Sequence, residues 1–329
     1  MSRVYEYQSG LAEPIRAFVA EKRALGLKYD KESKIFWELD GFLIEHEIQR
    51  PEFPQSVVEH WIEKRPNEKR KNQRYRLNFT KRFAIYLQSK GYDAYCPLLT
   101  ISARDDYDFI PYIFSNEELG ALIAYFDNMK PSNNYPNATM VFPLLFRTLI
   151  CCGMRAAEAA NIRIKDVDLL KGVVLIREAK HDKKRLVPLS EYLWAEYLRY
   201  SEIVHQNSDS EGYFFPNARG NPHHTNHIYD RFREALWHCG IQHKGRGYGP
   251  RVHDLRHTFA VRCMQKLQKT KGDIVTTLPY LSAYLGHYNM NKTQMYLRLI
   301  AEYFPEFIEK QCEYLEDTIP TWEVNYYEN

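Results

Sequence analysis

The sequence lacks the long apolar runs and the cysteine pairs that mark membrane proteins and disulfide-rich secreted proteins. No run of about 18 apolar residues occurs, so we expect no transmembrane helix. The first residues, MSRVYEYQSGLAEP, contain no apolar segment of the kind found in signal peptides. The six cysteines include no CxxC pair and no framework spacing. These absences predict a cytoplasmic protein with reduced cysteines and no membrane partner.

A strong net charge is also missing, since the chain carries only +3 at pH 7. The charges are unevenly distributed: residues 63–82 contain nine Lys or Arg and two Glu, whereas residues 301–329 contain eight acidic residues and one Lys. A basic band attracts phosphates and favours DNA binding, although by itself it is more often a solvated helix face. The candidate DNA-binding residues are Lys69, Arg70, Lys71, Arg74, Arg76, Lys81 and Arg82, with Lys244 and Arg246 in a later glycine-rich loop.

The length of 329 residues predicts two domains. The first part has apolar residues at helical spacing in four segments, at 14–25, 33–46, 54–64 and 72–90, and glycines follow the first and the last. We predict a helical domain over residues 1–100 and a linker over 101–112. A second domain is expected over 113–300, followed by a C-terminal tail over 301–329.

The second domain is predicted to combine helices with a small β-hairpin. Ser115 and Glu118 form a capping box that begins one helix, and an apolar segment at 138–152 ends at a glycine. The segments 172–177 and 185–189 are short and apolar, and a polar turn separates them. The expected fold class is therefore mainly α with a small β-sheet (α+β).

Four segments of the second domain carry polar residues that local structure does not explain. Residues three apart on a helix share one face, so an Arg and a Glu at that spacing can contact each other, and so can a His and an Arg. The candidate residues are Arg155 and Glu158, then Lys180, then His253, Arg256 and His257, and finally His287 and Tyr296.

Residues of these types suit transfer at a phosphodiester. Arginines bind phosphate oxygens through two parallel hydrogen bonds and stabilise the charge that develops in the transition state. A lysine or histidine can protonate the leaving oxygen, and a tyrosine can attack phosphorus and hold a covalent intermediate. Because the side chains supply the positive charge, we expect neither a metal nor another cofactor.

The four segments, in this order, resemble the tyrosine recombinase (phage integrase) family over about residues 114–299. The resemblance lies in GMRAAE, which contains Arg155, in KHDKKRLVPL, which contains Lys180, and in HDLRH. It continues in LGH, followed by TQMYL, in which Tyr296 comes nine residues after the histidine. The N-terminal part resembles that family's core-binding domain. The implied fold is a helical core-binding domain followed by a tyrosine-recombinase catalytic domain.

The resemblance implies a role for each residue. Tyr296 would attack the scissile phosphate and give a 3′-phosphotyrosine and a free 5′-hydroxyl. Arg155 and Arg256 would clamp the phosphate, and Lys180 would protonate the leaving oxygen.

The remaining candidates support these groups. His253 and His287 would stabilise the transition state and assist proton transfer. Glu158 would hold Arg155 in position, and His257 would support the site without contacting the phosphate. The implied partner is a duplex DNA recombination site. The enzyme would act as a homotetramer through a Holliday junction, would be a monomer or dimer when free, and would serve a mobile element.

Alternatives remain open for function and for residues. A type IB topoisomerase-like enzyme or a non-cleaving DNA-binding regulator would share parts of the pattern. Lys183 is the alternative to Lys180. Other tyrosines compete for the role of nucleophile, namely Tyr280, Tyr284 and Tyr288.

Three further segments carry weaker expectations. The histidines at 223, 224 and 227 fit a DNA-facing loop better than a metal site. The extra residues at 266–273 are expected to enlarge a surface loop. The tail at 301–329 has an apolar stripe and is expected to dock on a neighbouring protomer, with docking on its own domain as the alternative.

Overall fold

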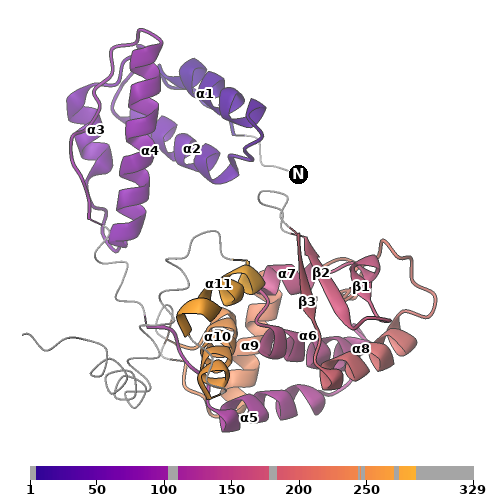
Figure 1. The fold of residues 1–329 in the computed structure, drawn as a ribbon. Coiled ribbons are helices and arrows are strands. Elements are labelled where there is room, and N and C mark those ends of the chain that lie inside the picture. Colours follow the sequence, from indigo (N-terminus) through magenta and orange to yellow (C-terminus); the bar gives the residue numbers. More distant parts are fainter. Residues whose placement is uncertain are drawn as a thin grey trace, which may run out of the picture. The chain divides into compact units, whose positions relative to one another are not determined.

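The computed structural model describes residues 5–102, 110–177, 184–243, 245, 249–269 and 274–286. The chain divides into two compact units, Met1–Phe109 and Ile110–Asn329 (Figure 1). Both units are mainly helical, and the second contains a small sheet, as the sequence predicted. In the part of the chain that the structure describes, no helix is both long and apolar enough to cross a membrane.

The first unit consists of four helices around an aromatic core. Phe36 packs edge-on against Phe18, Phe79 and Phe83, with ring centroids 4.5–5.7 Å apart, which is the favoured geometry for aromatic pairs. Each helix lies within a few residues of its predicted range. The helices are α1 (Ala12–Ala24), α2 (Asp30–Glu45), α3 (Gln55–Ile62) and α4 (Arg70–Ser89).

The helices of the second unit surround α6, which packs against α5, α7, α8 and α10. The predicted capping box is confirmed, because Ser115 accepts from the Glu118 N–H and Glu118 accepts from the Ser115 N–H. The helices are α5 (Asn116–Asp127), α6 (Ala138–Cys152), α7 (Ala156–Ala160), α8 (Glu191–Val204), α9 (Thr225–His238), α10 (Val252–Lys269) and α11 (Ile274–Leu285).

The sheet has three antiparallel strands in the order β1-β2-β3 (Figure 1). The strands β2 (Val173–Arg177) and β3 (Lys184–Pro188) form the predicted hairpin, with Val174 opposite Val187 and Ile176 opposite Arg185. The sequence did not predict β1 (Val167–Asp168), because two residues are too few to show alternation.

The prediction that residues 266–273 enlarge a surface loop is partly wrong. Residues 266–269 continue α10, which ends at Lys269, instead of entering a loop after the preceding motif. The segment contains Lys, Leu and Gln, which are all good helix formers, and no glycine. The extra length therefore extends the helix by about one turn before the chain reaches the segment 270–273, which lies outside the described residues.

Candidate active site

A single glycine directs the chain from α6 into the candidate site. Gly153 ends α6 with φ +58°, a conformation that glycine adopts without steric cost. A Cβ at this position would also lie 2.4 Å from Cδ1 of Phe259. Glycine is therefore required here for two reasons, the backbone conformation and the lack of space for a Cβ. The tight turn places Arg155 directly before the short helix α7.

Arg155 and Glu158 contact each other as predicted. The backbone N–H of Arg155 donates to Oε2 of Glu158 (2.9 Å), and Nη1 of Arg155 donates to Oε1. The carboxylate is nearly buried, whereas a third of the Arg155 side chain (34%) is exposed. Glu158 is thus less accessible than Arg155, part of whose side chain can be reached from outside.

Arg256 lies on α10 and is almost completely buried, with 1% of the side chain exposed. Its Nη1 donates to the carbonyl of Gly153 (2.9 Å), and its Nη2 donates to the carbonyl of Leu285. Its Nη1 also lies 4.0 Å from Oε2 of Glu158. Arg256 therefore joins the end of α6 to the end of α11 and adds a second positive charge next to Glu158.

The end of α11 is the third element of the site. Arg155 Nη2 donates to the carbonyl of Gly286 (3.1 Å). Gly286 directly follows Leu285, whose carbonyl accepts from Arg256. Gly286 has φ +64°. Both arginines thus hold the backbone that leads directly into His287 in the sequence.

A third arginine, Arg185 on β3, also binds Glu158. Its Nη2 donates to Oε2 (2.6 Å) and its Nη1 to Oε1 (3.3 Å), which is a bidentate pair. Arg185 was not among the residues predicted for the site. The sequence pattern that could have indicated its burial is the alternation of inward and outward residues along a β-strand. Arg185 lies two residues before the buried Val187 and therefore on the same strand face.

The charges of the arginines shift the pKa of the neighbouring groups. Burial raises the pKa of Glu158, but the hydrogen bonds and charges of Arg185 and Arg155 outweigh burial and hold it below its ordinary value. Glu158 is therefore ionised at neutral pH. Among the described residues, Glu158 is the one carboxylate in contact with these three guanidinium groups, and that balance leaves an excess of positive charge, which suits an anion such as a phosphate.

His253 lies in the same positive environment. Its ring reaches the surface, yet the surrounding protein desolvates it and the charges of Arg256, Arg251 and Arg155 oppose a further positive charge. Together these effects lower the pKa of His253 to about 4. His253 is thus neutral at pH 7 and can accept or donate a hydrogen bond. His257, one turn later and buried, packs its ring edge-on against His253 at 4.9 Å.

The structure therefore brings together Arg155, Glu158, His253 and Arg256, with His257 behind them. The other candidates lie outside the described residues: Lys180, His287, Tyr296, Lys244 and Arg246.

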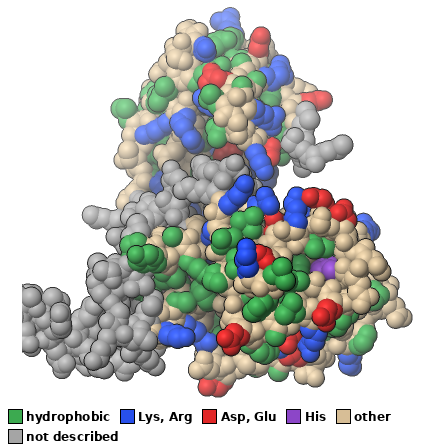
Figure 2. All heavy atoms as spheres, turned by 45° about the vertical axis from the view of Figure 1, so that its right-hand side comes forward, with side chains coloured by type: hydrophobic (Ala, Val, Ile, Leu, Met, Phe, Trp, Pro, Cys, Tyr) green, Lys and Arg blue, Asp and Glu red, His purple; other side chains and the backbone are tan. Residues whose placement is uncertain are grey.

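The basic residues of the first unit are mostly at the surface, and Figure 2 shows Lys and Arg side chains over the visible face of that unit. Lys69, Arg70, Lys71 and Arg82 are exposed, and Arg74 and Lys81 are half-buried.

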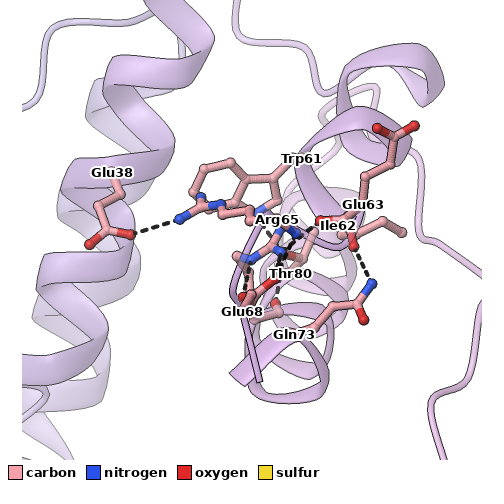
Figure 3. Close-up of polar contacts among 9 residues, drawn as sticks. Glu38, Trp61, Ile62, Glu63, Arg65, Glu68, Gln73 and Thr80 are labelled. Carbon is pink, nitrogen blue, oxygen red and sulfur yellow. Dashed lines mark hydrogen bonds and ion pairs between the residues drawn. The ribbon is translucent and has the colours of Figure 1, made fainter. Parts of the chain in front are cut away.

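Arg76 differs from the other basic residues of α4, because its side chain is buried. Its Nη2 donates to Oε2 of Glu68 (2.6 Å) and to the carbonyl of Glu63 (2.8 Å), and its guanidinium lies 5.4 Å from the ring centre of Trp61. Figure 3 labels these three partners, Trp61, Glu63 and Glu68. These contacts fix the connection between α3 and α4. We therefore remove Arg76 from the DNA-binding candidates.

One residue of the histidine segment before α9, His223, differs from expectation, whereas His224 is exposed as expected. His223 is buried, and its ring nitrogens lie 3.1 Å from the Tyr135 hydroxyl and 3.2 Å from Nδ1 of His227. Burial disfavours its charged form and lowers the pKa of His223 to about 4. His223 thus packs inside the unit instead of facing DNA. Among the residues that the structure describes, no group of three or more His, Cys, Asp or Glu could hold a metal ion.

Comparison with known proteins extends these observations. The sequence profile of the phage integrase family matches residues 113–302. The integrase/recombinase y4rB of Sinorhizobium fredii is 25% identical over 315 residues, which cover 94% of this chain and 99% of that protein. The tyrosine recombinase XerA of Pyrococcus horikoshii is 26% identical over 203 residues, which cover 61% of this chain and 61% of that protein.

One solved structure supports the fold. A lambda integrase (residues 75–356) dimer bound to a COC′ core site matches with a TM-score of 0.59 and 12% sequence identity. The match covers 85% of this chain and 96% of that chain. It includes both units, so the helical first unit and the mixed second unit occur together in a solved integrase.

Proposed function

This chain belongs to the phage integrase family, and is a tyrosine recombinase that breaks and rejoins DNA, and we propose that Tyr296 is the nucleophile of its cleavage reaction. In this proposal Tyr296 attacks the scissile phosphate of a duplex recombination site. The products are a 3′-phosphotyrosine and a free 5′-hydroxyl. Lys180 protonates the leaving 5′-oxygen, and the 5′-hydroxyl of a second duplex later attacks the phosphotyrosine to restore a phosphodiester.

The observation that carries the proposal is the excess of positive charge around Glu158. Negative charge builds up on the non-bridging oxygens as the tyrosine attacks, and fixed positive groups stabilise that charge without reorganising. Arg155 is the most exposed of the three arginines, so it is the group that a phosphate reaches first. His253, neutral before DNA binds, supports the same oxygens by hydrogen bonding.

Arg256 acts differently from Arg155 in the described conformation. Both of its Nη atoms donate to backbone carbonyls, at Gly153 and Leu285. Its charge acts on a phosphate at short range, and its hydrogen bonds hold the two segments that carry Arg155 and lead to His287.

We further propose that the reaction is site-specific recombination for a mobile element. Four protomers exchange two duplexes through a Holliday junction, and the free protein is a monomer or dimer. The exposed cations of α4 contact the DNA backbone. The likeness to an integrase/recombinase along nearly its full length supports this proposal. The reaction uses no ATP, because the phosphotyrosine conserves the energy of the broken bond, and no metal, because the side chains supply the positive charge.

A suicide substrate tests the proposed reaction. The probe is a duplex selected from a randomised library by binding to the full chain, with nicks placed so that a cleaved fragment diffuses away. The wild-type chain should form a covalent protein–DNA adduct in the presence of EDTA. Tyr296→Phe should bind the same duplex and form no adduct, because phenylalanine has no nucleophilic oxygen. An adduct formed by Tyr296→Phe would refute this assignment of the nucleophile.

A further inference from the structure

We infer that Arg185 is a positioning residue of the cleavage reaction, which orients Arg155 by holding the carboxylate that lies between them. The inference rests on the proposed function, since it concerns the same site. Arg185 does not need to touch the DNA for this role. Its side chain is 11% exposed, and that of Glu158 is 9% exposed.

The geometry of the Arg185–Glu158 pair is that of a rigid brace. Both Nη atoms of Arg185 donate to Glu158, one to each carboxylate oxygen, at 2.6 and 3.3 Å. Two parallel hydrogen bonds define the plane of a carboxylate, which a single bond cannot do. Arg185 lies on β3 and Glu158 on α7, 27 residues apart in the sequence. The pair therefore anchors the carboxylate to the sheet.

This anchor matters because α7 is a weak support by itself. The helix has only five residues, and short helices depend on tertiary contacts for their stability. Arg155 precedes the helix, and its Nη1 reaches Oε1 of Glu158 from only three residues away. The backbone N–H of Arg155 binds the other carboxylate oxygen, so both of these contacts come from the same end of α7. With Arg185 in place, the carboxylate has a fixed plane, and the guanidinium of Arg155 has a fixed direction.

Arg185 also changes how much charge Arg155 retains for a phosphate. If Glu158 faced Arg155 alone, one negative charge would neutralise one positive charge. The carboxylate instead accepts from Arg185 through both oxygens, and Arg256 lies 4.0 Å away. The negative charge is thus shared, so that Arg155 presents a stronger positive potential to an anion in this poorly solvated site.

The hairpin offers a matched control in Arg177, at the end of β2. Arg177 lies opposite Lys184, the neighbour of Arg185, and its Nη2 lies 2.6 Å from the buried carboxylate of Asp166. It thus pairs with a buried carboxylate from the same hairpin, although through one oxygen and from a more exposed position than Arg185. Asp166 belongs to the 3-10 helix Ile164–Asp166, and no described contact links it to Arg155. Loss of the Arg177 pair should affect stability without affecting the phosphate site.

The test compares cleavage rates on two DNA substrates that differ by one charge. The nicked duplex is the one selected by binding, made with an ordinary phosphodiester or with a neutral methylphosphonate at the scissile position. Full-length Arg185→Gln, Arg185→Lys and Arg177→Gln are compared with the wild type. The rate of adduct formation, the Kd for the duplex and the Tm are measured for each.

Arg185→Gln should slow adduct formation on the phosphodiester by about 100-fold, the effect of a small misplacement of a reacting group. The loss should be much smaller on the methylphosphonate, because the neutral group depends less on Arg155. Arg185→Lys should fall between the wild type and Arg185→Gln, since an ammonium keeps the charge but not the two parallel bonds. Arg177→Gln should cleave both substrates like the wild type, and the Kd values should change little.

Equal losses on both substrates would overturn the inference, because they would show a general loss of folded protein. Wild-type rates for Arg185→Gln would overturn it as well, and if that variant does not fold, wild-type rates for Arg185→Lys on both substrates would do the same. A wild-type chain that forms no adduct at all would overturn the proposed function first. The two failures are therefore distinguishable.

Discussion

Each unit of this protein contains arginine–glutamate contacts, and the two sets differ in their balance of charge. In the first unit, the buried Arg76 binds Glu68 at 2.6 Å. At the surface of the same unit, Arg65 lies 3.5 Å from Glu38 (Figure 3), so these two arginines contact different glutamate side chains. In the second unit, the three arginines Arg155, Arg185 and Arg256 lie around Glu158, the one carboxylate that the described contacts give them.

The difference shows how the same pair of residue types serves structure in one place and chemistry in another. A balanced pair has no remaining charge, so Arg76 and Glu68 fix a helix connection and attract nothing. An unbalanced cluster keeps a positive potential that an anion can neutralise. Burying such a cluster lowers the stability of the protein while no anion is bound. Sites that bind charged transition states keep this arrangement because the fixed charges then stabilise the transition state.

The largest expected effect compares Arg155 with Arg76. Arg155→Lys should slow adduct formation by about 100- to 1000-fold, because an ammonium cannot replace a planar fork at the transition state. Arg76→Lys should leave cleavage of bound DNA unchanged and lower only the Tm. Single-turnover assays at saturating protein measure both. A comparable rate loss in Arg76→Lys would contradict the distinction between the clusters.

The second effect compares the two glutamates. Removing one partner of a buried ion pair costs about 3 kcal/mol of unfolding free energy, and we expect this from Glu68→Gln without a change in cleavage rate. Glu158→Gln should cost at least as much and also slow cleavage, because three arginines lose their counter-charge. Denaturant unfolding and adduct formation provide the two measurements.

The pH dependence of these variants sharpens the comparison. Burial raises the pKa of Glu68 as it does that of Glu158, but the hydrogen bonds from arginine prevail and hold both below their ordinary value. Each carboxylate therefore stabilises the fold above its ordinary pKa, and this contribution disappears as pH falls through the lowered pKa. The stability gap between wild type and each Gln variant should close in acid. A gap that stays constant would show that the ion pairs do not cause it.

A smaller effect concerns His253, which has no counterpart in the first cluster. Its pKa of about 4 lies below the ordinary 6.5, so between these values the unfolded chain takes up a proton that the folded chain does not. A bound phosphate offsets the arginine charges and should raise this pKa. DNA binding between pH 4 and 6.5 should therefore take up protons, measured by calorimetry in buffers of different ionisation enthalpy. Equal uptake by His253→Gln would rule out His253 as the group.

The smallest effect concerns the exposed cations of α4. Lys71→Ala should weaken DNA binding at all sequences and reduce the slope of log K against log salt by about one. Arg76→Ala should leave the slope unchanged, because its charge is already paired with Glu68. Fluorescence anisotropy across a salt series measures both slopes. A reduced slope in Arg76→Ala would place that residue back among the DNA contacts.

Several expectations followed from local patterns and could be tested element by element. The glycine at 153 predicted the end of α6, and the spacing of Arg155 and Glu158 predicted their contact. The burial of Arg76 could have been predicted from its position on the helix, which a count of basic residues does not take into account. Arg76 shares a helix face with Thr80, Phe83 and Leu87, all of which are buried.

The helices, the hairpin and the order of the polar motifs could be predicted from the sequence, because helical and strand periodicity, caps and glycines act over a few residues. Which charges meet depends instead on how the elements pack in the folded chain. Arg256 binds the carbonyl of Gly153 across 103 residues, and Arg155 binds that of Gly286 across 131. Such contacts leave no local pattern, because they arise when separate elements pack together. For the same reason, the grouping of three arginines around Glu158 became visible only in the folded chain.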